Sequence, residues 1–425
     1  MSVHPYERFL RYKIRNQRIG SKLQKVMEIG FVPLPQKIPL GVAASRLPQG
    51  AQLRLISTTR GLAHIGSAWR ALEQNCHVPP TVFQSYDWLK CWADTHITPR
   101  SNVQIFFVVG FIGNRLVYAM PLTLWQTHGA RMLTWASQPI GQYGDVLCDK
   151  SVNLAQWTNA ALGFTRQQKQ ADLLRLRHVR ATSNIGPHAK QNFHDGKLYE
   201  RAPAMDLTRF ANEAEYDARY SPEQRHRRKR IRAKIEKIGA LNFEIIGQNK
   251  VAATIDQALH EKLKWLTRRG RYSSALHCPN HASFLKALAS QPTETLQTIT
   301  AQLSAGDQPI SWELSFIYQG TQYLYLTSHM AHLTDLSPGR LTFDLSQRQA
   351  LRQGLKSYDL MIPYDPHKES WATQTESVND FYLPLNTYGA FYGHFYFGWL
   401  RPILRKIYLG LPMGKLKVLQ KILRY

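Results

Sequence analysis

The chain has 425 residues and a formal net charge of +25. Hydrophobic residues make up 44% of it and aromatic residues 11%, which is typical of a folded globular protein and excludes general disorder. The length suffices for two or three domains. The positive charge favours anionic partners, namely nucleic acid, phosphorylated cofactors, acidic glycans or an anionic membrane surface, but it does not choose among them.

Residues 1–60 are predicted to form a basic N-terminal segment, with a helix that lies either on a surface or against the rest of the protein. The segment lacks the apolar core of a secretory signal, and the chain has no uncharged run of about 18 apolar residues. We therefore expect a cytoplasmic protein without a transmembrane helix. Four cysteines without zinc-type spacing are expected to be small buried side chains: Cys76, Cys91, Cys148 and Cys278.

Residues 61–200 are predicted to form the first half of a duplicated α/β fold. A helix with the sequence VFQSYDWLKCWAD precedes three strands, the loop GQYGDVLCD, a second helix and a fourth strand. The expected strands cover residues 103–111, 116–125, 131–136 and 172–178, and the second helix covers residues 153–164. The many turn-forming residues of the following segment, 180–203, predict a linker.

The stretch SPEQRHRRKRIRAKIEKIG, residues 221–239, is predicted to be a basic helix near the start of the second half, residues 201–385. Ser221 is a favourable N-cap, Pro222 suits the first helical position, and Gln224 completes a capping box. A disordered basic tail would show no such caps. The positive run is therefore expected to be one face of a folded helix.

The same helix has an apolar stripe at the spacing i, i+4, i+7. Three isoleucines form this stripe and should be buried: Ile231, Ile235 and Ile238. The arginines of the opposite face should meet solvent near a substrate cleft: Arg225, Arg228 and Arg232. Such a face would guide an anionic substrate, with an effect that fades as salt increases.

The order of elements in the first half returns about 190 residues later, which predicts a tandem repeat. After a strand at 241–245 and a helix at 281–289, three strands are expected at residues 296–303, 310–318 and 322–328. A loop, a helix from Leu341 to Gly354 and a strand at 357–363 follow. Two units of three strands, a loop, a helix and a strand predict a duplicated α/β fold with a mixed sheet.

The two copies differ in the loop before the long helix. In the second copy this loop reads Ser337, Pro338, Gly339, Arg340, Leu341. Glycine permits a close approach of a ligand, and amides at a helix N-terminus next to an arginine favour phosphate. The alternative is an ordinary helix start without a ligand. The first copy has residues 141–145, with an acid and no arginine, so one cofactor site is expected, in the second half.

Five motifs in this order resemble a known family: FQSYDWLKCWAD, GQYGDVLCD, SPEQRHRRKRIRAKIEK, LSPGRLTFDL and YDLMIPYDPHKESWA. The chain resembles the BioF-like/CelD-type acetyltransferases of the GNAT superfamily over roughly residues 80–375. These bacterial proteins are often linked to cellulose or exopolysaccharide production. They share a duplicated GNAT fold with the Fem-type aminoacyltransferases.

The resemblance implies a tandem duplicated GNAT-like acyl-CoA N-acyltransferase fold with basic N- and C-terminal extensions. It also implies that the loop from Ser337 to Leu341 would hold the diphosphate of acyl-CoA, with acetyl as the expected acyl group. Two departures are visible. GNAT loops are often richer in glycine, and the family usually has small apolar residues where Trp312 and Glu313 stand.

Three residues are candidates for catalysis: Glu313, Asp365 and Lys368. Glu313 falls mid-strand, next to where GNAT enzymes bring the acceptor amine, and its carboxylate would deprotonate the ammonium. The alternative is an outward-facing glutamate on a half-exposed strand. By the resemblance, Lys368 would bind a phosphate or carboxylate of the acceptor and Asp365 would orient it, the alternative being a salt bridge within the loop.

Acceptor binding is also expected at Arg227, Arg228 and Tyr364. His329 and His367 form no spaced cluster with acids, so no metal site is expected. After Asp380 the chain contains no acid. Residues 386–425 are therefore predicted to be a basic, aromatic C-terminal tail, which either lies on the anionic inner membrane or docks on the preceding domain.

The leading hypothesis is transfer of an acyl group from acyl-CoA to an amine, on an anionic small molecule or glycan of exopolysaccharide or cell-envelope synthesis. One alternative is a Fem-type transferase that uses aminoacyl-tRNA, with the basic helix as its tRNA contact. Another is a non-catalytic scaffold that binds an anionic glycan or partner. Only Tyr220 near the basic run could stack on a base, so nucleic acid is not expected as a partner.

Overall fold

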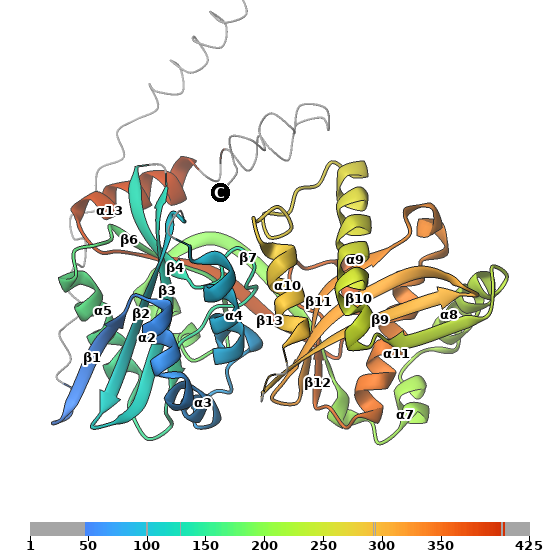
Figure 1. Ribbon diagram of the computed structural model, residues 1–425, viewed down its shortest axis with the longest axis horizontal. Coiled ribbons are helices and arrows are strands. Elements are labelled where there is room, and N and C mark those ends of the chain that lie inside the picture. The colour runs from blue at the N-terminus through green and yellow to red at the C-terminus, as the bar shows by residue number, and fades with distance from the viewer. Residues whose placement is uncertain are drawn as a thin grey trace, which may run out of the picture. The chain divides into compact units, whose positions relative to one another are not determined.

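The structure, a computed structural model, describes residues 47–98, 101–127, 129–291, 293, 295–400 and 403. These residues belong to a single compact unit. Most of the predicted N-terminal segment and the end of the predicted C-terminal tail lie outside the described residues. In the described part, thirteen strands form one mixed sheet (Figure 1).

The first half contributes six strands to this sheet: β1 (Ala51–Ile56), β2 (Val103–Ile112), β3 (Arg115–Thr127), β4 (Ala130–Trp135), β5 (Leu147–Cys148) and β6 (Leu173–Arg180). β1 to β4 are antiparallel neighbours, and β6 pairs with β4 in parallel. The helices are α2 (Thr59–His64), α3 (Gly66–Gln74), η1 (Val82–Gln84), α4 (Tyr86–His96), α5 (Leu154–Gln167) and α6 (Gly186–Asn192). Asn153 caps α5 through its side chain.

The second half contributes seven strands: β7 (His194–Asp206), β8 (Leu241–Ile245), β9 (Leu296–Ala305), β10 (Gln308–Tyr318), β11 (Thr321–His329), β12 (Ser357–Asp359) and β13 (Gln374–Pro384). Its helices are η2 (Leu207–Arg209), α7 (Glu213–Ala218), α8 (Pro222–Glu236), α9 (Gln248–Arg268), α10 (His281–Ser290), η3 (Ala331–Leu336), α11 (Pro338–Arg352) and α12 (Pro366–Glu369). The C-terminal helix α13 (Thr387–Gly393) continues into a π-helix (His394–Leu400). β9, β10 and β11 are antiparallel, and β12 pairs with β11 in parallel.

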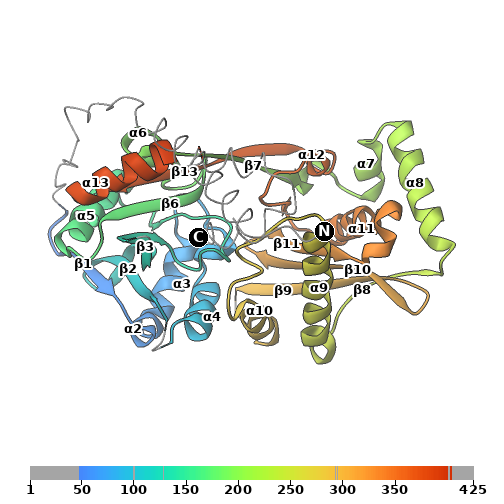
Figure 2. The same cartoon turned by 90° about the horizontal axis from the view of Figure 1, so that it is seen from above.

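The two halves therefore repeat one unit of three antiparallel strands, a helix and a parallel strand. The strand order is β1-β2-β3-β4-β6-β13-β7-β12-β11-β10-β9-β8, with β5 beside β3. β13 and β7 join the halves, since β13 pairs with β6 on one side and with β7 on the other (Figure 2). The predicted mixed α/β fold with a tandem repeat is confirmed.

Helices cover both faces of each half, which explains why the strands are apolar on both sides. On one face α4 and α10 share a core, where the ring of Trp88 packs 4.8 Å from Phe284 and 5.3 Å from Phe316. On the other face, α5 covers the first half and α8 and α11 cover the second. The sequence of β10 alternates accordingly, with Trp312 in the shared core and Glu313 under α11.

The basic helix forms largely as predicted. Its N-cap is Ser221, and the capping box with Gln224 is present. Ile235 is fully buried and Ile231 partly buried, but Ile238 is 42% exposed, so the prediction for Ile238 is wrong. The helix ends at Glu236, and a residue beyond the last turn no longer follows the helical period.

The predicted linker at 180–203 is also wrong, because this segment forms α6 and the first part of β7. Turn-forming residues are only a weak guide when tertiary pairing supplies the hydrogen bonds, and β7 is paired on both sides. The predicted boundaries of the segments, 1–60, 61–200, 201–385 and 386–425, stay predictions; β7 runs through the boundary at residue 200. The four cysteines are free thiols, two buried and two half-buried.

Candidate functional site

β11 and β12 separate after a short contact. They pair only over Thr321–Tyr323 and Ser357–Asp359, while β11 continues to His329. The chain after Asp359 turns away through Met361, which has a positive φ of 58°. A gap between two parallel strands exposes backbone polar groups that the sheet no longer pairs, and such a gap is a natural place for a ligand.

Helix α11 starts beside the end of β11. Its N-cap, Ser337, is in the left-handed conformation (φ 54°) and makes no capping hydrogen bond through its side chain. A Cβ added to Gly339 would meet a single atom within 4 Å, Nδ1 of His329 at 3.9 Å. Gly339 is therefore not required for internal packing. The open space lies at the positive end of the helix dipole, which favours an anion.

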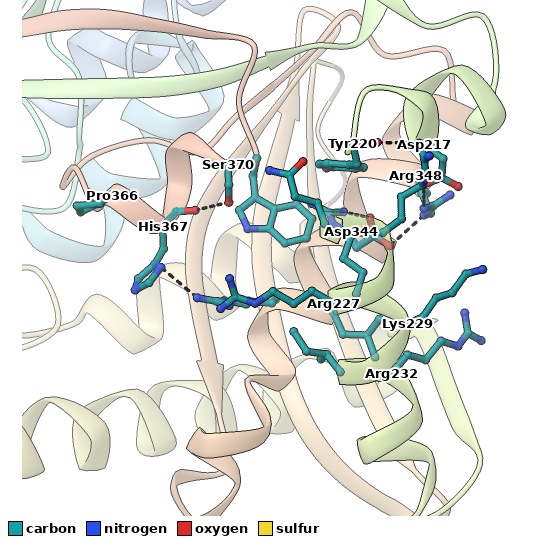
Figure 3. Close-up of a pocket in the computed structure, with 17 residues that line it drawn as sticks. Asp217, Tyr220, Arg227, Lys229, Arg232, Asp344, Arg348, Pro366, His367 and Ser370 are labelled. Atoms are coloured by element: carbon teal, nitrogen blue, oxygen red, sulfur yellow. Dashed lines mark hydrogen bonds and ion pairs between the residues drawn. The ribbon is translucent and has the colours of Figure 1, made fainter. Parts of the chain in front are cut away.

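A cavity of ≈ 370 Å³ lies between α8, the first turns of α11 and α12 (Figure 3). Seven of its lining residues are arginine or lysine and two are aspartate. Arg340 lines this cavity and contacts Nδ1 of His367 at 3.1 Å. Burial and the neighbouring Arg227 lower the pKa of the Arg340 guanidinium. Two like charges close together favour an anion between them.

Arg228 does not face solvent, so that prediction is wrong. Its guanidinium lies 3.3 Å from the ring centre of Tyr220 and 3.8 Å from that of Trp371, and it forms an ion pair of 2.8 Å with Asp344. The helical period alone placed it outside, but α11 and α12 cover this side of α8. Arg225 donates to the carbonyl oxygen of Tyr220 at 2.7 Å. Arg227 and Arg232 are exposed, as expected for Arg232.

Lys368 lies on α12 and is held by backbone carbonyls. Its Nζ donates to the oxygens of Leu360, Met361 and Pro363 at 2.9, 2.9 and 3.0 Å. Asp365 is the N-cap of α12, because its Oδ1 accepts from the amide of His367 at 2.9 Å. Both residues thus stabilise the conformation of the segment that follows β12, at the edge of the gap.

Tyr364 lies next to this loop, where its hydroxyl accepts from Arg201 at 3.3 Å. Arg201 also pairs with Glu369 at 2.8 Å, and its guanidinium lies 4.8 Å from the Tyr364 ring. Tyr364 is thus on the same loop as Lys368. Its amide donates to Glu200 of β7 at 3.2 Å.

Two further residues at the gap were not predicted as site residues, Lys262 of α9 and His329. Burial lowers the pKa of both Lys262 and Lys368 to about 8, and the charge of Lys262 further lowers the pKa of Lys368. Burial and Lys262 also lower the pKa of His329. These groups are therefore close enough to interact. Lys262 carries no sequence signal, since it lies in an ordinary amphipathic helix far from any motif.

Glu313 is fully buried beneath α11. Its Oε1 accepts from Ser346 at 2.6 Å, from Tyr358 at 2.7 Å and from Gln322 at 3.3 Å. Its Oε2 has no hydrogen-bond partner. Burial raises the pKa of this carboxyl to about 7. Neither the outward-facing alternative nor an open catalytic position describes this geometry, because a substrate could reach the carboxyl only if α11 moved.

The corresponding loop of the first half is filled by its own contacts. The carboxylate of Asp145 accepts from the amides of Val146, Asn184 and Ile185 at 2.8 to 2.9 Å. Tyr143 is buried and donates to Asp359 of the second half at 2.9 Å. A Cβ on Gly144 would lie only 1.8 Å from Nε1 of Trp135. This loop has no room for a ligand.

No metal site is found in the part of the chain that the structure describes, since it holds no group of three His, Cys, Asp or Glu side chains placed for an ion. In the same part, no helix is both long and apolar enough to cross a membrane.

Comparisons with known proteins agree with this geometry. Residues 223–369 match the family model for the acetyltransferase (GNAT) domain, and this range runs from α8 to α12. A search of curated proteins gives no match. Among solved structures, the chain is similar to FemX, with 10% identity and a TM-score of 0.52 over 81% of this chain and 99% of that chain. A tandem GNAT protein from the clavulanic acid biosynthesis pathway is similar at 11% identity and a TM-score of 0.44, over 79% and 99% of the chains.

These findings define the class. The fold is a tandem GNAT-like fold, and the second half contains the segment that matches the acetyltransferase domain. They support acyl transfer in general, with acyl-CoA as the cosubstrate of GNAT domains. The likeness to FemX is a likeness of fold alone, because the identity is only 10%.

Proposed function

We propose that the protein is an acyltransferase whose second half binds acyl-CoA and transfers the acyl group to an amine. The acyl group that we propose is acetyl. The observation that carries the proposal is the start of α11. There Gly339 borders open space and Arg340 forms no ion pair among the described residues, within the segment matched to the GNAT domain. Residues 337–341 would hold the diphosphate of the cosubstrate.

The chemistry of this group fits the residues present. A diphosphate needs hydrogen-bond donors and positive charge, and the first turn of α11 supplies both. The acyl group arrives as a thioester when the cosubstrate is bound. The chain's own residues would position the acceptor beside it, along the gap between β11 and β12, with Lys262 and Lys368 providing positive charge at its border.

The acceptor side is proposed to be the loop that follows β12. Lys368 stabilises this loop through three carbonyl contacts, and Asp365 caps its short helix. In this role Lys368 and Asp365 position the loop, whereas from the sequence alone they were candidates for catalysis. Tyr364 is half-buried beside them and is proposed to contact the acceptor. Glu313 acts as a base only if α11 opens, so the proposal does not depend on it.

We further propose that the protein is a BioF-like/CelD-type acetyltransferase and that its acceptor is an anionic molecule of exopolysaccharide or envelope synthesis. The five motifs and the net charge of +25 support it. A Fem-type transferase that uses aminoacyl-tRNA remains the second candidate. It is favoured by the exposed cations of α8, including Arg227 and Arg230, which could contact phosphates.

Calorimetry separates these candidates. The full chain is titrated with acetyl-CoA, with longer acyl-CoAs and with deacylated tRNA at two salt concentrations. We expect saturable binding of acyl-CoA and weak RNA binding that is strongly reduced by salt. Selective, tight binding of tRNA without binding of acyl-CoA would reject the proposal in favour of the Fem-type reaction. Binding of neither ligand would leave a scaffold without this catalysis.

A peripheral membrane contact is proposed for the C-terminal region. Gly389, Gly393 and Phe397 form the inner face of its helices, whereas Tyr388 and Phe391 are 49% and 60% exposed. Aromatic side chains next to an acid-free basic segment are typical of interfacial helices. Replacement of Tyr388 and Phe391 by serine should weaken flotation with anionic liposomes and leave acyl-CoA binding unchanged. Equal flotation with neutral and anionic lipid would contradict this contact.

A further inference from the structure

The cavity between α8, α11 and α12 has more positive charge than its own acids neutralise. Arg348 is fully paired, since it contacts Glu213, Asp217 and Asp344 at 2.5 to 3.1 Å. Arg228 shares Asp344 with it. Both acids that line the cavity are thereby used by these two arginines, so the remaining cations have no acid left in the cavity wall.

Three guanidinium groups of this wall form no ion pair in the described part of the chain, those of Arg225, Arg227 and Arg340. Arg225 donates to the carbonyl oxygen of Tyr220, which leaves Arg227 and Arg340 without an oxygen acceptor among the described residues. Arg227 extends from α8 toward His367 (Figure 3) and is near enough to lower the pKa of Arg340. Asp365 interacts with Arg340 but forms no ion pair with it, and it offsets only part of the repulsion from Arg227. An anion between the two arginines would reduce the repulsion and accept hydrogen bonds from both guanidinium groups.

The cavity adjoins the proposed diphosphate site, because Arg340 and Leu341 of the first turn of α11 also line the cavity. A ligand whose diphosphate lies on that turn therefore has its next anionic group at this cavity. Its volume of ≈ 370 Å³ lies in the range of about 300–1,000 Å³ that is usual for small-molecule sites. Arg228 also lines the cavity, and its guanidinium is stacked on the rings of Tyr220 and Trp371.

We infer that this cavity binds the 3′-phosphorylated ribonucleotide end of the acyl donor, with Arg227 as the residue that recognises the 3′-phosphate. The inference rests on the proposed function and deepens it by naming how the donor is selected. It also assigns Arg227 to the donor, whereas the sequence suggested the acceptor. Helix α8 then serves as the outer wall of the donor site and not as a guide for the acceptor.

The test compares two donors that differ only in one phosphate, acetyl-CoA and 3′-dephospho-acetyl-CoA. Affinities are measured by calorimetry for the unmodified chain and for two variants, Arg227→Glu and Arg230→Glu. Arg230 is exposed on the same helix but does not line the cavity, so it controls for the change in net charge. We expect at least a 10-fold preference for the 3′-phosphorylated donor, reduced to below 3-fold by Arg227→Glu and unchanged by Arg230→Glu.

The outcomes separate the two proposals. If the unmodified chain binds both donors equally, or if Arg227→Glu keeps the preference, the inference is wrong while the proposed function stands. If the chain binds neither donor, the proposed function fails and the inference fails with it. If deacylated tRNA binds selectively and Arg227→Glu alone abolishes that binding, the cavity serves a nucleic acid and the donor assignment is overturned.

Discussion

The loops that precede the long helices of the two halves are packed differently, although they occupy the same place in the repeat. The loop around Gly144 is closed, since Asp145 accepts three backbone amides and Gly144 lies against Trp135. The loop around Gly339 is open, and its Arg340 contacts His367 and forms no ion pair among the described residues. The two copies of the repeat thus differ in structure at this loop: one is filled by its own contacts, and the other leaves the space in which we propose a ligand.

The largest expected effect is on the open loop. Arg340→Glu should weaken acetyl-CoA binding by at least about 100-fold, roughly 3 kcal/mol, because it inverts the charge beside the proposed diphosphate. Calorimetry gives the measurement, and Arg230→Glu is the control for net charge. If affinity is unchanged by Arg340→Glu but lost on substitutions around Gly144, the roles of the two loops are reversed.

The buried polar groups beneath the two long helices offer a second contrast. Under α5, Tyr118 meets Thr158 at 3.3 Å, a neutral pair, whereas under α11 Glu313 is ionisable with a pKa raised to about 7. Between pH 4.5 and 7 the folded state keeps this proton and the unfolded state releases it. Stability from this group is therefore complete below pH 4.5 and declines as the pH rises through 7, by about 3 kcal/mol at most.

Urea unfolding at pH 5 and pH 8 measures this decline. Glu313→Gln removes the titrating group and should lose less stability over this range than the unmodified chain. Glu244→Gln, an exposed substitution on β8, should keep the full decline. An unchanged pH dependence in Glu313→Gln would show that the carboxyl is not the source.

A matched pair of glycine substitutions compares packing in the two loops. Gly144→Ala should destabilise the fold by about 2 kcal/mol or more, since the new methyl overlaps the ring of Trp135. Gly339→Ala should change stability by less than about 1 kcal/mol, with a gain from helix propensity. Thermal or urea unfolding checks both. Similar losses in the two variants would refute the distinction between a closed and an open loop.

The smallest expected effect concerns the contact between the halves. Tyr143→Phe removes one hydrogen bond to the buried carboxylate of Asp359 and should cost about 1–2 kcal/mol of stability. Tyr199→Phe, at a residue 61% exposed, should cost less. An equal cost for both would indicate that Tyr143 does not join the halves.

Much of the fold was predictable from local pattern. The capping box of Ser221 and Gln224, the cap of α5 at Asn153 and the period-two strands all depend on neighbours in sequence, and the structure contains them. The errors have a common cause. Residues 180–203 and Ile238 were judged by composition and period, whereas pairing by β12 and β13 and the end of α8 decide their structure.

The candidate site was predictable only in part. The motif at residues 337–341 is contiguous, so its glycine and arginine could be read directly. The surroundings of Lys368 and Glu313 could not, because their partners lie on other elements, such as Ser346 and Tyr358 for Glu313. Lys262 illustrates the limit, as it lies on α9 without a motif of its own and yet lowers the pKa of Lys368 and of His329.

The sequence by itself determined the repeat, the capped start of α8 and its basic face, and it indicated the loop that we propose for a phosphate, because these follow from spacing, capping and residue chemistry within a few positions. Only the tertiary structure decided which charges are neutralised. Arg228 and Arg348 form ion pairs with acids of other elements, whereas Arg227 and Arg340 form none among the described residues and lie near enough for Arg227 to lower the pKa of Arg340. The sequence gives only the net charge of the chain. Binding of an anion depends on which positive side chains remain without an acidic partner once the elements are packed.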